Sequence, residues 1–247
     1  MAFRVESAGK SDVGLVREKN EDSFVVEPTL GLYAVCDGMG GHVGGQVASQ
    51  TAAATIVETL RRGDHDEGVE PLATAILRAN RAVFARARAE PALHNMGTTV
   101  VAIREEGDLL HLCHVGDSRI YRLRQAKLEQ VTKDHSLTNL YAENPELAAR
   151  YGPANENVIV RAVGLRDEVE VDHRSVSMEH GDVYLLCSDG LTDMVDDWMV
   201  KEMLDDCAQG QSGLAAMEEC ANTLLRAALS NGGVDNVTAV VLRITER

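Results

Sequence analysis

Residues 31–45 read GLYAVCDGMGGHVGG, a short apolar run that ends at Asp37 and passes into a glycine-rich segment. The run has the length and composition of a buried strand, and five glycines fall in the eight positions from Gly38 to Gly45. A glycine-rich turn ahead of a helix can hold a phosphate on its backbone amides. The dinucleotide pattern G-x-G-x-x-G is excluded, because a count from Gly38 requires glycine where the chain has Val43.

Three more aspartates stand at the ends of apolar runs. Asp117 and Asp189 follow two of these runs, and Asp235 stands just before another. Aspartate also ends strands simply because it forms turns, and this alternative applies to each position taken alone. Four carboxylates that converge would form an oxygen-only site, which Mg²⁺ or Mn²⁺ suits better than Zn²⁺. Two such ions side by side serve in-line displacement at phosphorus.

Strand-like and helix-like segments come in blocks along the chain. Strands are predicted at 23–26, 31–36, 98–103, 109–115, 120–123, 158–163, 169–176, 183–187 and 237–244. Helices are predicted at 47–62, 71–90, 195–207 and 214–229, one pair early and one pair late. Because strands and helices do not alternate, we expect an α+β fold with antiparallel sheets and helices layered outside them. No repeat or linker divides the 247 residues, which favours a single domain, 1–247.

Composition restricts the partners and the compartment. The chain has a formal net charge of −15, which disfavours binding to nucleic acid or to an anionic membrane. Its five cysteines include no C-x-x-C pair, which indicates free thiols in a reducing compartment. No signal peptide and no apolar run of membrane-spanning length is visible, so we expect a cytoplasmic protein.

Two polar segments do not fit the strand and helix pattern. Residues 136–157, SLTNLYAENPELAARYGPANEN, predict a surface flap with a short helix near 146–151. The other segment, GLVREKNED, places Arg17 ahead of Glu21 and Asp22. It is either a surface ion-pair cluster or a guanidinium fork for a phosphoryl group, accompanied by acids that hold metal-bound water.

Eight motifs in order, from about residue 11 to residue 242, resemble the bacterial branch of the metal-dependent protein phosphatase (PPM, type 2C) family. They read SDVGLVREKNED, AVCDGMGGHVGG, GTTVVAI, HVGDSRIYRLR, QVTKDHS, IVRAVG, LLCSDGLTDMV and GVDNVTAVVL. The resemblance implies a four-layer αββα sandwich, with two antiparallel β-sheets flanked by helix pairs. It also implies hydrolysis of phosphoserine and phosphothreonine in proteins, with two Mn²⁺ or Mg²⁺ ions and a third ion held more weakly.

The same resemblance implies a set of metal ligands. Asp37 is similar to the carboxylate that bridges two metals, and Gly38 offers its carbonyl oxygen to one of them. Asp189 and Asp235 match the remaining ligands of the other ion. Asp117 matches a ligand of the third metal, shared with Asp189.

Further positions match residues that act around the metals. Glu21 and its neighbour Asp22 match acids that hold metal-bound water, and Arg17 matches the catalytic arginine that binds phosphate. Eukaryotic members often place a histidine, assigned as general acid, directly after Asp-Gly, where this chain has Met39. His42 lies three residues later and is a candidate catalytic acid, with a purely structural role as the alternative.

The expected reaction is direct attack on phosphorus by a metal-bridging hydroxide, with Arg17 holding the phosphoryl oxygens. Expected partners are phosphorylated proteins and a cognate Ser/Thr kinase that the enzyme opposes, and the protein is expected to be a monomer. Two alternatives remain. One is a non-catalytic regulator of the same fold that binds phosphoproteins, and the other is a phosphatase of a small phosphorylated metabolite.

Overall fold

The computed structural model describes residues 3–40, 44–63, 70–152 and 158–246. Within them lie β1 (Phe3–Asp12), β2 (Ser23–Glu27), β3 (Leu32–Cys36), β4 (Gly38–Met39), β5 (Gly97–Thr98), β6 (Val100–Glu106), β7 (Leu109–Val115), β8 (Arg119–Arg124), β9 (Lys127–Gln130), β10 (Asp172–Ser177), β11 (Val183–Cys187) and β12 (Val237–Glu246). Two five-stranded antiparallel sheets have the orders β1-β12-β11-β8-β9 and β10-β7-β6-β3-β2. Strands β4 and β5 form a small ladder of their own.

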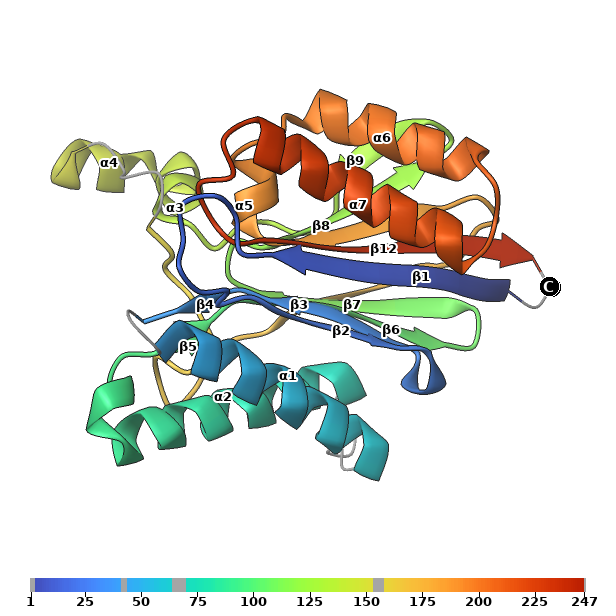
Figure 1. The fold of residues 1–247 in the computed structure, drawn as a ribbon. Coiled ribbons are helices and arrows are strands. Elements are labelled where there is room, and N and C mark those ends of the chain that lie inside the picture. Colours follow the sequence, from blue (N-terminus) through green and yellow to red (C-terminus); the bar gives the residue numbers. More distant parts are fainter. Residues whose placement is uncertain (1–2, 41–43, 64–69, 153–157, 247) are drawn as a thin grey trace.

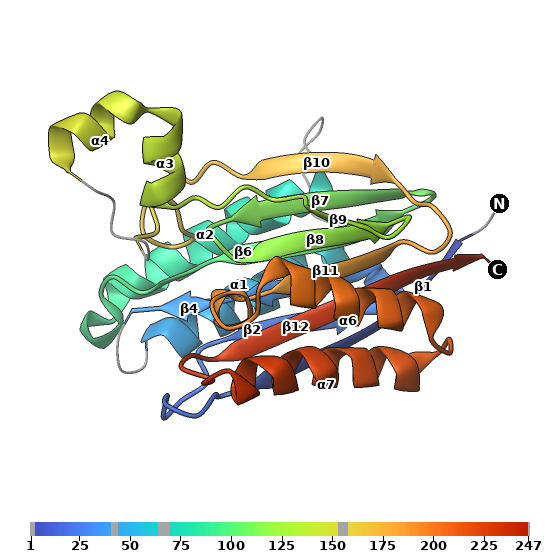
Figure 2. The same ribbon diagram turned by 90° about the horizontal axis from the view of Figure 1, so that it is seen from above.

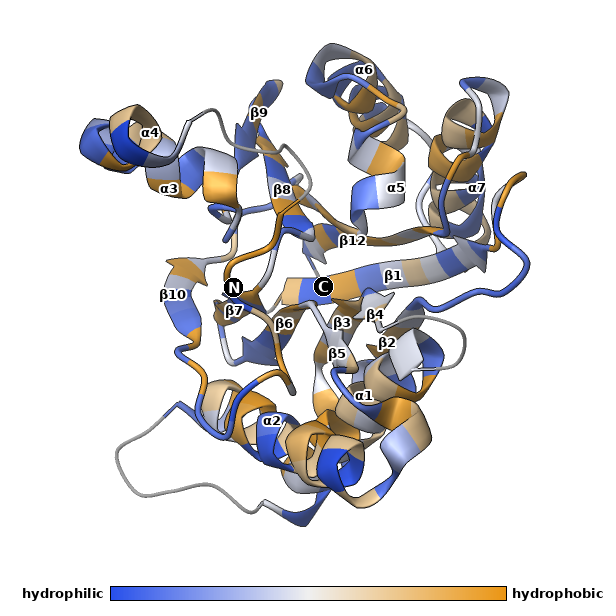
Figure 3. Ribbon diagram, turned by 90° about the vertical axis from the view of Figure 1, so that its left-hand side faces the viewer, coloured by the Kyte–Doolittle hydropathy of each residue, from blue (hydrophilic) through white to orange (hydrophobic). Residues whose placement is uncertain are grey.

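The helices among the described residues are α1 (Gly44–Arg62), α2 (Pro71–Ala89), α3 (Leu137–Glu143), α4 (Pro145–Tyr151), α5 (Asp189–Thr192), α6 (Asp197–Gln209) and α7 (Leu214–Ser230). Two pairs cover the outer faces of the large sheets, whereas α3 and α4 project from one end of the sandwich (Figure 1). Helices α6 and α7 lie over one sheet and α1 and α2 over the other, so the predicted four-layer αββα sandwich is confirmed (Figure 1). The views from above and end-on show the same layers (Figures 2 and 3). Across the described residues, each helix is too short or too polar to span a lipid bilayer.

Successive side chains of a central strand point alternately to the other sheet and to the helix layer, so both faces of the strand bury apolar side chains. In β3, Tyr33 and Val35 face the other sheet, whereas Leu32, Ala34 and Cys36 pack with α1 and α2. All five residues are buried, because a strand between a sheet and a helix layer has no solvent face. Strand β11 is buried in the same way, and these two inner strands lead directly to Asp37 and Asp189.

Several predicted elements need correction. The segment 158–163 is not a strand, because it makes only two isolated bridges, Ile159 with Ser136 and Val163 with Thr98. The predicted strand 169–176 begins later, as β10. Strand β1 was not predicted because its sequence, FRVESAGKSD, lacks an apolar run, although all ten residues pair with β12. The expected short helix is α4, and a further helix, α3, precedes it.

Candidate metal centre and active site

The four aspartates follow β3 and β7, open α5 and precede β12. These element ends lie at the end of the sandwich where α3, β4 and β5 are found (Figure 1). Antiparallel pairing brings them together. Strands β3 and β7 both pair with β6, so Asp37 and Asp117 follow strands that end at one edge. Strand β12 begins beside the end of β11, which brings Asp235 close to Asp189. The structure brings these four aspartates to the same end of the sandwich, where Asp37, Asp117 and Asp235 each interact electrostatically with Asp189.

A cavity of about 470 Å³ opens at this point. Its lining residues are Arg17, Glu18, Lys19, Glu21, Asp37, Gly38, Met39, Gly40, Ile159, Asp189, Asp235 and Asn236. Asp117 does not line the cavity, but it lies close enough to Asp189 for the charge of Asp189 to raise its pKa. The apolar residue Ile159, which was wrongly assigned to a strand, forms part of the cavity wall.

Asp37 and Asp189 lie close enough together at the centre of this group for each carboxyl group to shift the pKa of the other. Burial raises the pKa of Asp37 well above its ordinary value, and the charges of Asp22 and Asp189 raise it further. Burial also raises the pKa of Asp189. Two buried carboxyl groups that interact this closely require either a shared proton or a cation, because like charges at this distance repel strongly.

Two more acids have an oxygen without a partner. Asp22 Oδ2 accepts hydrogen bonds from Ser188 Oγ (2.8 Å) and Thr238 Oγ1 (2.6 Å), yet its buried Oδ1 has no hydrogen-bond donor. Asp117 Oδ1 is also buried without one. Burial is the main reason that the pKa values of both Asp22 and Asp117 rise to about 7. Unpaired carboxylate oxygens fit hard divalent cations such as Mg²⁺ or Mn²⁺.

Arg17 lies at the mouth of the cavity and pairs with Asp235. Its Nη2 donates a hydrogen bond of 2.6 Å to Asp235 Oδ2, and 57% of the Arg17 side chain is exposed. This hydrogen bond is also the main reason that the pKa of Arg17 is raised. Among the described residues, no three of these acids bring oxygens within 4.8 Å of one another. Binding of one ion by Asp37, Asp189 and Asp235 together would therefore require their carboxylate oxygens to move closer together.

Glycine is required where the backbone closes around Glu21. A Cβ at Gly38 would lie 2.1 Å from the Gly45 carbonyl oxygen and 2.6 Å from that of Glu21. A Cβ at Gly45 would lie 2.3 Å from Glu21 Oε2 and 2.7 Å from the Gly38 carbonyl oxygen. The Gly38 carbonyl and the Glu21 carboxylate thus face the same narrow space, as a shared cation site would require.

Asn236 is a site residue that the sequence analysis missed. Its Oδ1 accepts a hydrogen bond from the Glu21 amide (2.7 Å), and its Nδ2 donates to the carbonyls of Val13 and Lys19 (2.9 Å each). These three bonds attach the loop that carries Arg17 and Glu21 to the start of β12. The dipeptide Asp235-Asn236 was the available signal, but an asparagine beside a turn is too common to indicate this anchor by itself.

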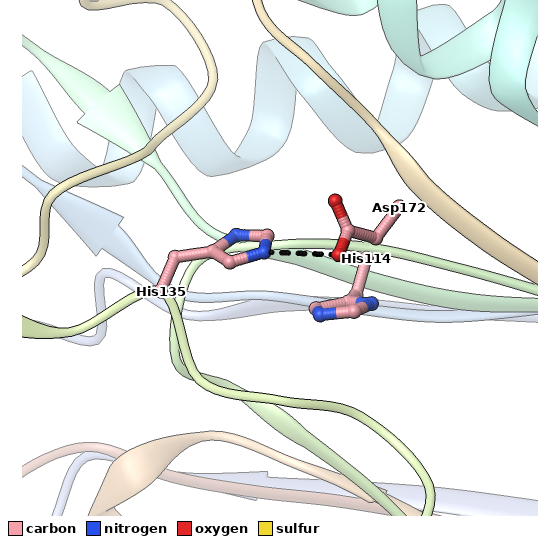
Figure 4. A group of neighbouring side chains, drawn as sticks. All are labelled: His114, His135 and Asp172. Atoms are coloured by element: carbon pink, nitrogen blue, oxygen red, sulfur yellow. Dashed lines mark ion pairs between the residues drawn. The ribbon is translucent and has the colours of Figure 1, made fainter. Parts of the chain in front are cut away.

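His42, the candidate general acid, lies outside the described residues. A different group, His114, His135 and Asp172, brings possible ligand atoms within 4.8 Å of one another (Figure 4).

The ligand atoms of this histidine cluster already have protein partners. His114 Nε2 donates to the Lys133 carbonyl (3.0 Å), and His135 Nδ1 accepts from the Gly116 amide (3.0 Å). Asp172 is paired with the Arg161 guanidinium (2.5 Å). The two imidazoles stack with centroids 4.7 Å apart, so their in-plane nitrogens do not converge on one ion. The cluster is a hydrogen-bonded support at the base of segment 136–157.

Cys113 and Arg119 have the C-x₅-R spacing of phosphatases that use a cysteine nucleophile. The structure does not support that chemistry here. Cys113 is buried within β7, and burial raises the pKa of its thiol. Arg119 is paired with Asp134 at 2.8 Å. A nucleophilic cysteine needs an accessible thiolate, and Cys113 is neither accessible nor acidic.

Comparison with known proteins agrees with this geometry. The family model of protein phosphatase 2C matches residues 16–230. The serine/threonine protein phosphatase PstP of Mycobacterium tuberculosis is 38% identical over 245 residues, which cover 97% of this chain and 45% of that protein. The chain thus spans about half the length of this relative. The serine/threonine phosphatase Stp of Listeria monocytogenes is 32% identical over 242 residues, which cover 94% of this chain and 93% of that protein.

A solved structure of the PstP catalytic domain in complex with two manganese ions superimposes with a TM-score of 0.82 at 38% identity, covering 99% of this chain and 100% of that one. With the family model, the two relatives and the four-layer fold in agreement, the chain belongs to the protein phosphatase 2C family.

Proposed function

We propose that this chain hydrolyses phosphoserine and phosphothreonine in proteins, with two Mn²⁺ or Mg²⁺ ions and a third ion bound more weakly. The observation that carries the proposal is the buried Asp37–Asp189 pair, because these interacting carboxyl groups line a cavity together with other oxygen ligands. The two manganese ions of the PstP structure support the choice and number of ions. The names of the curated relatives support the substrate class.

The proposed ligands follow from position. Asp37 would bridge two ions, with the Gly38 carbonyl on one of them and Asp189 and Asp235 on the other. Glu21, which faces Gly38, would hold an ion through water. When bound, such ions supply an acidified water and neutralise charge on the phosphoryl group.

Asp117 and Asp22 have different surroundings. Asp117 would join Asp189 in a third, weaker site, because its free Oδ1 is buried and its charge interacts with that of Asp189. Asp22 is held by Ser188 and Thr238, so we place it behind the ligands as an acid that orients water.

Arg17 would bind the substrate phosphoryl group. Its guanidinium is exposed at the cavity mouth and already forms a charge-assisted hydrogen bond with a carboxylate oxygen, and phosphate oxygens suit the same planar donor fork. The departing serine or threonine oxygen needs a proton. We assign its delivery to the Asp117 side of the site, with His42 as the competing source.

The wider assignments are also proposals. We take the chain as one phosphatase domain, 1–247, with 136–157 as a flap beside the cavity, since Ile159 at the flap's end lines that cavity. We also take the protein to act as a monomer. A protein phosphatase acts on the product of a protein kinase, so a cognate Ser/Thr kinase is the expected opposing enzyme. The free cysteines among the described residues support a cytoplasmic location.

The decisive experiment measures phosphate release from phosphoserine and phosphothreonine peptides, with sugar phosphates alongside. Activity should require Mn²⁺ or Mg²⁺ and disappear with EDTA. Asp37→Asn should reduce kcat by far more than tenfold, while the matched variant Asp108→Asn, at an exposed hairpin position, should not.

A stability measurement separates lost chemistry from lost folding. Because the ionised form of Asp37 is disfavoured by burial, Asp37→Asn should unfold in EDTA at or above the wild-type temperature. More than about a tenth of wild-type kcat in Asp37→Asn, a change under about 1.4 kcal/mol, would contradict the ligand assignment. Faster hydrolysis of sugar phosphates than of phosphopeptides would instead favour a metabolite phosphatase.

A further inference from the structure

Helices α6 and α7 lie side by side on the outer face of their sheet (Figures 1 and 2). Each contributes a cysteine to the space between them. Cys207 stands near the end of α6 and Cys220 is in the second turn of α7, and both line a cavity of about 260 Å³. Cys207 is partly exposed through this cavity, whereas Cys220 is 7% exposed. The pair is thus accessible from one side only.

Both thiols border this one cavity, between the end of α6 and the second turn of α7. Their mutual interaction lowers the pKa of Cys207 and raises that of Cys220. The positive charge of Arg243 lowers the pKa of Cys207 further. The Arg243 guanidinium is fixed in place because its Nη1 donates to the carbonyls of Cys207, Gly210 and Gln211, at 3.1–3.2 Å.

The other three cysteines are inaccessible, and the pKa of each of their thiols is raised. Cys36, Cys113 and Cys187 are buried in strands, each at most 1% exposed. Burial raises the pKa of Cys36 and of Cys187 to about 12, and it also raises that of Cys113. Oxidation of thiols follows thiolate character and access, so Cys207 is distinguished from these three on both counts.

We propose that Cys207 and Cys220 form a reversible disulfide under hydrogen peroxide, with Cys207 as the attacking thiol and Cys220 as the resolving thiol. The Cys207 thiolate attacks one peroxide oxygen and the O–O bond breaks, so that with one added proton the products are a Cys207 sulfenic acid and water. The Cys220 thiol then displaces the hydroxyl group as a second water. In total, two thiols lose two electrons and two protons to one peroxide.

The disulfide would stabilise the helix layer without switching off the phosphatase. It closes a loop of 14 residues, from 207 to 220, within the cluster of apolar side chains under α6 and α7. Such a loop predicts a rise in the unfolding midpoint on the order of 5 °C for a chain of this size. The start of α6 follows the segment that begins at Asp189, and the end of α7 leads to Asp235. Both cysteines lie away from these two helix ends.

The test treats the Mn²⁺-loaded protein with a small excess of hydrogen peroxide and counts free thiols by maleimide labelling and mass spectrometry. Wild type should fall from five free thiols to three, give a linked Cys207–Cys220 peptide, and recover all five thiols with dithiothreitol. Its unfolding midpoint should rise, and its turnover should stay within about twofold of the untreated enzyme.

Two variants separate the roles of the two thiols. Cys220→Ser should leave a sulfenic acid on Cys207 that dimedone labels, and Cys207→Ser should lose no thiol. Cys113→Ala is the matched control in a buried position and should still lose two free thiols on treatment with peroxide. An unchanged thiol count in wild type, a lasting dimedone adduct on wild-type Cys207, or a disulfide between two chains would overturn the proposal. Because wild-type peptide mapping alone decides these outcomes, the proposal does not depend on the folding of any variant.

Discussion

Replacing Asn236 by alanine should release the loop that carries Arg17 and Glu21. The side chain makes three hydrogen bonds to that loop, one from the Glu21 amide and two to the carbonyls of Val13 and Lys19, all between 2.7 and 2.9 Å. Asn236 is 5% exposed, so water does not occupy the same position in the folded protein. The variant leaves every proposed metal ligand in place.

The magnitude follows from these three bonds. Each contributes about 1 kcal/mol to the free energy of unfolding, so their loss costs about 2–3 kcal/mol once partial rehydration of the exposed loop is allowed for. For a chain of this length the unfolding midpoint should fall by roughly 5–10 °C. A loosened loop also misplaces Arg17, and kcat/KM for a phosphopeptide should fall by roughly 10–100-fold, mostly through KM.

Asn231→Ala is the matched control. It removes the same type of side chain five positions earlier, but it breaks a single exposed hydrogen bond of 2.8 Å, from Asn231 Nδ2 to the Met194 carbonyl. Thermal unfolding and steady-state kinetics of the two variants should differ clearly, with Asn231→Ala close to wild type. If Asn236→Ala matches Asn231→Ala in both measurements, other contacts hold the loop and the anchoring role is wrong.

Three further predictions address the charged groups around the cavity. Arg17→Ala should raise KM for phosphopeptides by about 10–100-fold without weakening Mn²⁺ binding, because it removes a hydrogen-bond donor to the phosphoryl group and frees Asp235. If calorimetry shows that Mn²⁺ affinity falls as much as catalysis does, Arg17 has a structural role instead. Asp117→Ala should slow hydrolysis of phosphoserine peptides much more than that of nitrophenyl phosphate, whose leaving group hardly needs a proton; equal losses, or the selective loss in His42→Ala instead, would reject Asp117. Burial lowers the pKa of His135 to about 4, so its neutral form stabilises the fold above pH 6.5 and this stability is lost as the pH falls toward 4. Urea unfolding at pH 5 and pH 7.5 should therefore show wild type losing about 1–2 kcal/mol more than His135→Asn, which keeps an acceptor for the Gly116 amide but cannot titrate; parallel losses in both proteins would contradict this.

The sequence predicted the layers well because most of the elements carry strong local signals. Strands β7 and β11 and helices α2 and α7 lie within one residue of their predicted bounds, since their apolar spacing matches what each element buries. The edge strand β1 gave no such signal, because pairing with β12 rather than apolar content determines it. Conversely, 158–163 is apolar but not a strand, since Ile159 forms a wall of the cavity. Local composition therefore cannot identify an edge strand that forms through pairing, nor exclude an apolar segment that forms a cavity wall.

The functional site also has features that the sequence predicts and features that it does not. Carboxylates at strand ends could be predicted to converge, because antiparallel pairing places alternate strand ends at one edge. The residues that anchor the loop could not be predicted in this way, because Asn236 acts through hydrogen bonds to loop carbonyls some two hundred positions earlier in the chain. The same holds for Ser188 and Thr238, which meet at Asp22 although nothing local relates the three. Pairing of distant polar groups depends on the finished fold.

The backbone around Asp37 explains how the fold tolerates such a concentration of charge. Thr98 Oγ1 and the Thr99 amide both donate to the Asp37 carbonyl at 2.8 Å, and the Asp37 amide donates to Thr99 Oγ1 at 3.1 Å. With the main chain fixed on both sides, the Asp37 side chain remains against Asp189 despite their mutual repulsion. A divalent cation bound between them would relieve this repulsion, and the binding energy would be available because the apolar strands hold the acids in place beforehand. We therefore expect residues that touch no ion, such as Thr99, to influence how strongly the site binds one.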